Sequence, residues 1–123
     1  MILIAKVVAQ GALMRDECRG AHYKPEFAIP ATDADEPAEL REQAKKWCNA
    51  FKTQTDRWLK TTVAEFTEDG PKITYEEVDT SLIPPRPRTY GLKGAEIIDE
   101  VWRDMGRDFA AVGRTAAATP TRK

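Results

Sequence analysis

Prolines divide this chain into short segments and so limit the folds available to it. Eight prolines occur in 123 residues. A proline lacks the backbone N–H donor and is excluded from helix interiors and central strands. Three helical patterns occur along the chain, and two runs rich in β-forming residues lie between the second and the third. The length suits one modest core. We therefore expect an α+β fold that is mostly α, with about three helices, one antiparallel hairpin and a proline-rich extended strap.

The first segment, residues 2–18, is apolar at a spacing that predicts a helix with a broad buried face, through Ile4, Val7, Val8, Ala12 and Met14. Gly20 is expected to cap its end in a left-handed conformation. No capping side chain precedes the first turn, so we interpret this helix as part of a longer structure. A buried strand through residues 2–8 is the alternative, because short apolar runs are ambiguous.

Helical spacing returns in two later segments, first in Leu40, Ala44, Trp47, Cys48 and Phe51, and again in Ala95, Ile98, Val101, Trp102, Met105 and Phe109. Between them, residues 61–66 and 72–76 are rich in β-forming side chains. Turn chemistry in Asp69-Gly70-Pro71 joins these two runs, which predicts an antiparallel hairpin.

The segment 81–90 contains three prolines and is expected to be extended. It is either a rigid linker or a strap that contacts a partner domain through Arg86 and Arg88. We expect a C-terminal helix within residues 91–114 and a disordered tail at 115–123.

The charge balance excludes several partners. The chain has 19 Lys and Arg against 20 Asp and Glu, so it has no overall positive charge to attract the phosphate backbone. We therefore expect no nucleic-acid partner. The apolar start is shorter than the roughly 20 residues of a membrane span, and we expect no direct membrane insertion.

Cys18 and Cys48 are too few for a disulfide scaffold and lack the Cys-x-x-Cys spacing, so two free thiols are expected.

The inventory of catalytic groups is short. The chain has one histidine, His22, and one serine, Ser81, and no Gly-x-Gly-x-x-Gly turn or familiar metal-ligand spacing. We therefore predict no catalytic, cofactor-binding or metal-binding residue, and no activity for the isolated chain. The polar run from Arg15 to His22 has two readings, a helix C-terminus with capping cations or a contact surface. The residues predicted to dock on another domain are Arg15, Glu17, Arg19, His22, Arg86 and Arg88.

At this run the chain resembles the flavoprotein subunit of succinate dehydrogenase and fumarate reductase, in which a Glu-Ser-Arg-Gly-Ala-His sequence closes a helix of the C-terminal region. Here it stands as Glu17-Cys18-Arg19-Gly20-Ala21-His22. The resemblance continues in Trp58-Leu59-Lys60-Thr61-Thr62, the Asp69-Gly70-Pro71 turn and residues 78–90. It covers roughly residues 7–27 and 56–90, with Cys18 in place of the usual serine.

The resemblance implies that residues 1–90 form the C-terminal helical region, of the spectrin-like bundle type, with a probable insertion at 28–55. It implies a parent subunit that oxidises succinate to fumarate through covalent FAD and passes electrons to an iron–sulfur subunit and quinone. The parent would lie in the cytoplasm on the inner face of the membrane, and this piece would bind no FAD itself. It would contact the flavin-binding domain of the same subunit through Arg19 and His22.

Three alternatives remain open. Fumarate reductase and L-aspartate oxidase have related C-terminal domains, although the 81–90 segment argues against the oxidase. From another class, the chain is a free-standing protein-interaction module. If the first helix is severed from its neighbours, its apolar face is expected to drive the isolated chain to form a homodimer.

Overall fold

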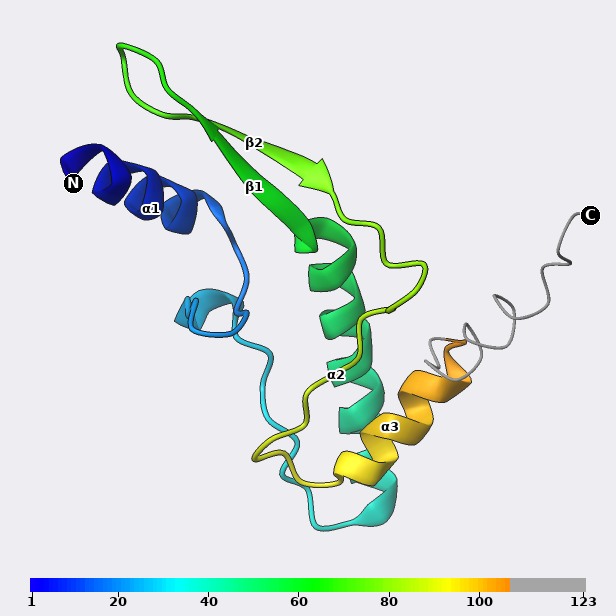
Figure 1. Cartoon of the computed structure of the whole chain (residues 1–123). Helices are drawn as coiled ribbons and strands as arrows, with labels where there is room; N and C mark the ends of the chain where they lie inside the picture. The colour runs from blue at the N-terminus through cyan, green and yellow to red at the C-terminus, as the bar shows by residue number, and fades with distance from the viewer. Residues whose placement is uncertain (107–123) are drawn as a thin grey trace, which may run out of the picture. The chain divides into compact units, whose positions relative to one another are not determined.

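The computed structural model describes residues 1–106 of the chain, which contain three α-helices, a short 3-10 helix and one two-stranded antiparallel sheet (Figure 1). The expected α+β, mostly helical fold is confirmed. The chain divides into two compact units. The first comprises Met1–Ile29 and Gln54–Val78, and the second comprises Pro30–Thr53 and the described residues from Asp79 on. The tail predicted at 115–123, and the helix predicted beyond residue 106, lie outside the described residues.

Helix α1, Ile2–Met14, confirms a helix rather than a strand at the start of the chain, but two details of the prediction were wrong. None of its residues is buried, although the periodicity predicted a broad buried face. The helix also ends at Met14 instead of continuing to Cys18, because Arg15 takes an extended conformation, with φ −90° and ψ 104°. Gly20, with φ 59°, therefore lies in a turn beyond the helix and does not cap it.

The hairpin of the first unit pairs β1, Lys60–Glu65, with β2, Lys72–Glu77. Its register places Val63 opposite Thr74 and Lys60 opposite Glu77. The Lys60 ammonium and the Glu77 carboxylate form an ion pair of 2.8 Å across this register. The hairpin prediction is thus confirmed to within one residue at each strand end. A two-stranded sheet is marginally stable alone, so side chains from elsewhere in the unit must support it.

The second unit holds a core built from the two helical patterns. Helix α2, Pro37–Trp58, starts with a proline in its first turn, where the missing N–H costs little. Helix α3, Ala95–Asp104, has its buried side chains Ile98, Val101 and Trp102 on one face. Trp47 stacks on Phe51 with ring centroids 5.4 Å apart, and Phe51 meets Trp102 edge to face at 5.3 Å. The apolar spacing thus predicted the buried faces of α2 and α3, although α3 ends before Met105 and Phe109 lies outside the described residues.

The proline-rich strap has neither helix nor strand over residues 84–89. Pro87 is buried, and Arg86 beside it forms an ion pair of 3.3 Å with Asp99 of α3. A backbone hydrogen bond of 3.1 Å from Lys93 to the Thr32 carbonyl links the end of the strap region to the segment before α2. Within residues 1–106, none of the helices has the length and apolar character needed to cross a membrane.

Candidate functional site

The polar run after α1 folds into a tight loop of the first unit. The backbone N–H of Arg19 donates to the His22 carbonyl and the N–H of His22 donates to the Arg19 carbonyl, both at 3.0 Å. Gly20 has a positive φ while Ala21 has a negative one, the pattern of a type II′ turn, which needs glycine at its first central position. The turn holds the side chains on either side of it close to one another.

Glu17 is the centre of the loop, with a side chain that is 0% exposed. Its carboxylate receives two guanidinium groups, Nη1 of Arg15 at 2.5 Å and Nε of Arg19 at 2.9 Å. A buried carboxylate without such partners would be very unfavourable, because it loses its hydration. Glu17 therefore fixes where both arginines can lie.

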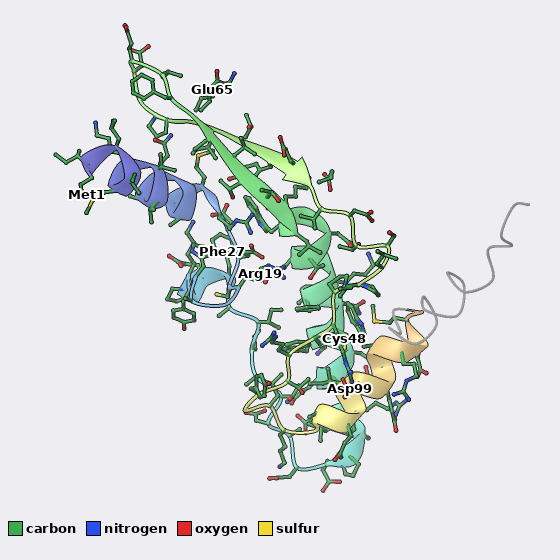
Figure 2. All side chains as sticks on the ribbon, in the orientation of Figure 1. Met1, Arg19, Phe27, Cys48, Glu65 and Asp99 are labelled. Atoms are coloured by element: carbon green, nitrogen blue, oxygen red, sulfur yellow. The ribbon has the colours of Figure 1, made fainter. Side chains whose placement is uncertain are left out.

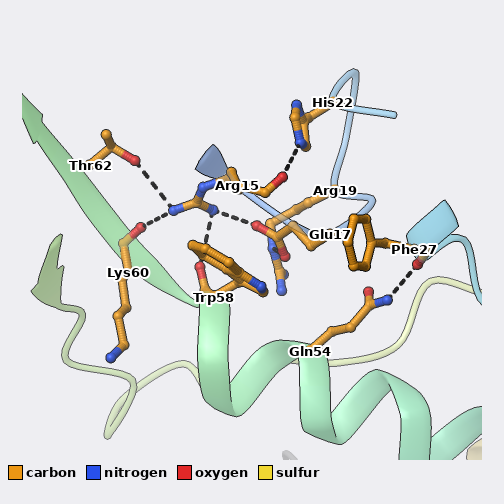
Figure 3. Close-up of polar contacts among 9 residues, drawn as sticks. All are labelled: Arg15, Glu17, Arg19, His22, Phe27, Gln54, Trp58, Lys60 and Thr62. Carbon is orange, nitrogen blue, oxygen red and sulfur yellow. Dashed lines mark hydrogen bonds and ion pairs between the residues drawn. The ribbon is translucent and has the colours of Figure 1, made fainter. Parts of the chain in front are cut away.

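Arg15 connects this loop to the end of α2 and the start of β1 (Figure 3). Its Nη1 also donates to the Trp58 carbonyl at 3.0 Å, and its Nη2 donates to the Lys60 carbonyl at 2.7 Å. A longer contact of 3.4 Å reaches the Thr62 hydroxyl. Trp58 is the last residue of α2, so its carbonyl lacks a helical partner, and the Arg15 cation satisfies it.

Aromatic rings surround the same guanidinium. The Arg15 Cζ atom lies 5.7 Å from the centre of the Trp58 ring system and 6.0 Å from the centre of the Tyr75 ring. Trp58 and Tyr75 meet edge to face at 5.5 Å. Cation–π attraction within about 6 Å adds to the hydrogen bonds, and more so when the cation is shielded from water. Arg15 thus joins α2 to both strands of the hairpin.

The rest of the loop is closed by local bonds. His22 Nε2 donates to the Arg15 carbonyl at 2.8 Å, and Lys24 Nζ donates to the Leu13 carbonyl in the last turn of α1 at 2.6 Å. Cys18 makes two hydrogen bonds with Lys24: its thiol donates to the Lys24 carbonyl at 3.1 Å, and its sulfur accepts from the Lys24 N–H at 3.4 Å. The serine-to-cysteine departure is accommodated here.

Arg19 differs from Arg15 in how much of it is used. Its side chain is 33% exposed, and Nε makes its one hydrogen bond within residues 1–106. The two terminal nitrogens stay available, in the planar geometry that binds a carboxylate with two hydrogen bonds. The loop thus contains one arginine committed to the internal structure and one with spare donors.

The six residues of the docking prediction are placed differently by the structure. Arg15, Glu17, Arg19 and His22 lie together in the loop, whereas Arg86 and Arg88 belong to the second unit, where Arg86 pairs with Asp99 and Arg88 is exposed. Five further residues of this site were not predicted from the sequence: Trp58, Lys60, Thr62, Tyr75 and Lys24. A signal for three of them was present, because residues 58–62 are one of the runs that resemble the family. Among residues 1–106, no cluster of His, Cys, Asp or Glu is placed to hold a metal ion.

Comparisons with known proteins point in one direction. A family model described as the fumarate reductase flavoprotein C-terminal region matches residues 1–90. The chain is 37% identical over 95 residues to the succinate dehydrogenase flavoprotein subunit of Bacillus subtilis, an alignment that covers 76% of this chain and 12% of the relative. It is 34% identical over 99 residues to the fumarate reductase flavoprotein subunit of Helicobacter pylori, covering 76% and 11%. The chain therefore matches only about an eighth of the length of these relatives. No solved structure matches the chain significantly.

Proposed function

Because this chain belongs to the fumarate reductase flavoprotein C-terminal family, we propose that it is the C-terminal helical region of a succinate dehydrogenase-type flavoprotein subunit and serves there as a structural and docking domain. The observation that carries the proposal is the contact between two runs that resemble the family. The run 17–22 and the run 58–62 are joined through Arg15 and the buried Glu17.

The chemistry that we assign to the whole subunit is the oxidation of succinate to fumarate with FAD as the acceptor, followed by electron transfer to an iron–sulfur subunit and quinone. The complex would lie on the cytoplasmic face of the membrane. The described residues of this chain do not fit a flavin site. Their two strands are antiparallel, whereas dinucleotide folds use parallel strands with a glycine-rich turn before a helix. No step of the reaction is therefore assigned to this chain.

The docking role falls on the exposed part of the loop. Two guanidinium nitrogens of Arg19 have no hydrogen-bond partner in the described part of the chain and lie beside a fixed backbone turn, and we assign them to a carboxylate or carbonyl group of the flavin-binding domain. His22 supports this position from within the loop, since its ring holds the Arg15 carbonyl. Arg86 and Arg88 remain candidates for a separate contact by the second unit.

The test is a chimera in which this chain replaces the matched segment of the Bacillus subtilis flavoprotein subunit. The chimera should retain flavin and reduce an artificial dye with succinate. Arg19→Ala should weaken docking by about 2 kcal/mol, the range of hydrogen bonds to charged groups, and speed flavin loss on heating. Arg41→Ala is the matched control, because that arginine is exposed and, among the residues that the structure describes, pairs with Glu100 and Asp104 alone. A folded chimera that lacks both flavin and activity would overturn the proposal.

A second candidate function, a free-standing interaction module, is favoured by the exposed apolar side chains of α1. Such a module would associate with itself or a partner as an isolated chain, which sedimentation would detect. The chimera separates the two candidates, since a module has no reason to restore flavin retention.

A further inference from the structure

Helix α1 is apolar on all sides and yet exposed. The side chains of Ile2, Leu3, Ile4, Val8 and Leu13 are each more than half exposed. Lys6 is the one charged residue of the helix. A helix that is hydrophobic all round is typical of a buried position, and exposed apolar areas of this kind mark interaction surfaces. Figure 2 shows side chains projecting on opposite sides of the α1 ribbon, which begins next to the labelled Met1.

One side of α1 faces a hollow rather than a flat surface. The hollow has a volume of about 690 Å³ and lies between the first turns of α1 and the end of the hairpin. Its apolar lining includes Leu3, Ile4 and Val7 of the helix and Phe66 of the hairpin. Phe66 is 72% exposed, so an aromatic side chain stands at the edge of the hollow without a covering group.

The charges around the hollow are mostly negative. Glu65, Glu68 and Asp69 line its hairpin side and Lys6 its helix side. Glu65 already pairs with Lys72 at 3.6 Å, whereas Glu68 and Asp69 have no ion-pair partner within residues 1–106. A complementary occupant is therefore apolar along its length and carries Lys or Arg at the end beside Glu68 and Asp69.

Two observations identify the occupant of the hollow: the negative charge of the hairpin end and the length of the matched relatives. A second copy of this chain would bring the same acidic hairpin end to the interface, and its α1 would offer a single lysine. The matched relatives extend over about eight times the length that this chain covers, so most of the subunit lies outside it. We propose that the hollow between α1 and the hairpin end binds an apolar segment with basic flanks from the remaining part of the flavoprotein subunit. This inference rests on the proposed function and adds a docking surface distinct from the Arg19 loop.

Hydrogen exchange of residues 2–14 in the Bacillus subtilis chimera tests the proposal. In the isolated chain the exposed α1 should exchange quickly, and in the chimera at least about tenfold more slowly, because burial of even one leucine corresponds to about that factor. Leu3→Glu, inside the hollow, should restore fast exchange. Leu13→Glu, on the same helix but outside the hollow lining, is the matched control and should have little effect.

The two variants also separate docking from helix stability. A glutamate near the N-terminus of a helix is favourable and one near the C-terminus is unfavourable, so an effect on the helix alone would rank the variants in the opposite order. Charge is tested with Glu68→Lys combined with Asp69→Lys, which should speed exchange, against Glu76→Lys on β2, which should not.

The outcomes distinguish this inference from the proposed function. If the unmodified chimera lacks flavin and activity, the proposed function fails. If the chimera is active but Leu3→Glu and Leu13→Glu exchange at the same rate, the hollow is not the docking surface. If Leu3→Glu breaks a dimer of the isolated chain and leaves exchange in the chimera unchanged, the occupant is a second copy and the proposal is overturned.

Discussion

Replacing Arg15 by methionine should lower the free energy of unfolding of the first compact unit by about 3 kcal/mol. The substitution keeps an unbranched stem and removes the cation. Three hydrogen bonds of 3.0 Å or less disappear, to Glu17, the Trp58 carbonyl and the Lys60 carbonyl. Removal of one partner from a buried ion pair costs about 3–5 kcal/mol. The lower end applies, because Arg19 still holds the other oxygen of the Glu17 carboxylate.

The double variant with Glu17→Gln separates the causes. If most of the loss comes from a buried charge left without enough partners, Arg15→Met with Glu17→Gln should recover about 1–2 kcal/mol relative to Arg15→Met alone. Arg15→Lys should fall between the wild type and Arg15→Met, because one ammonium cannot span the carbonyls and the carboxylate as the planar guanidinium does.

The assay uses the indole N–H resonances of the three tryptophans during urea unfolding. Trp58 belongs to the first unit, while Trp47 and Trp102 lie in the core of the second, so one spectrum reports on both. Arg15→Met should shift the Trp58 signal and its urea midpoint and leave the other two unchanged. A loss below about 1 kcal/mol, within the range of an exposed ion pair, would refute the assignment of Arg15 as the link between α2 and the hairpin.

Two glycines should respond oppositely to alanine. Gly11→Ala should stabilise α1 by about 1 kcal/mol, because the new methyl group would lie 3.9 Å from the Thr62 Cγ2 atom, an ordinary contact. Gly94→Ala should destabilise the second unit, because Gly94 has a φ of +73° and the new methyl group would lie 2.8 Å from a Leu40 carbon. Thermal melts of both variants should show a higher melting temperature for Gly11→Ala and a lower one for Gly94→Ala. Burial raises the pKa of the Cys48 thiol from its ordinary 9.0 to about 11. The unfolded chain therefore loses this proton first, so the contribution of Cys48 to the free energy of unfolding should be constant below pH 9 and should fall as the pH rises from 9 to 11. Cys48→Ala is the control in pH-dependent urea titrations.

Local sequence determined much of the secondary structure of this protein. The helical spacing through Trp47 and Phe51 predicted the face that α2 buries, and the spacing through Ile98 and Trp102 did so for α3, because a helix brings every third or fourth side chain to one side. The β-forming runs on either side of Asp69-Gly70-Pro71 predicted the hairpin almost to the residue. The order of the runs resembling the family likewise identified the family that the comparisons show.

The tertiary structure alone decided where α1 ends, that its side chains are exposed and what the polar run does. The spacing of apolar residues shows which face of a helix can be buried, but it does not show whether another element packs against that face. For this reason α1 was predicted to have a buried face, whereas in the structure none of its residues is buried. Arg15 leaves the helix for carbonyls 43 and 45 residues away in the chain. Such bonds depend on the folded path of the backbone, and they turn a polar run with two possible readings into a loop built around the buried Glu17.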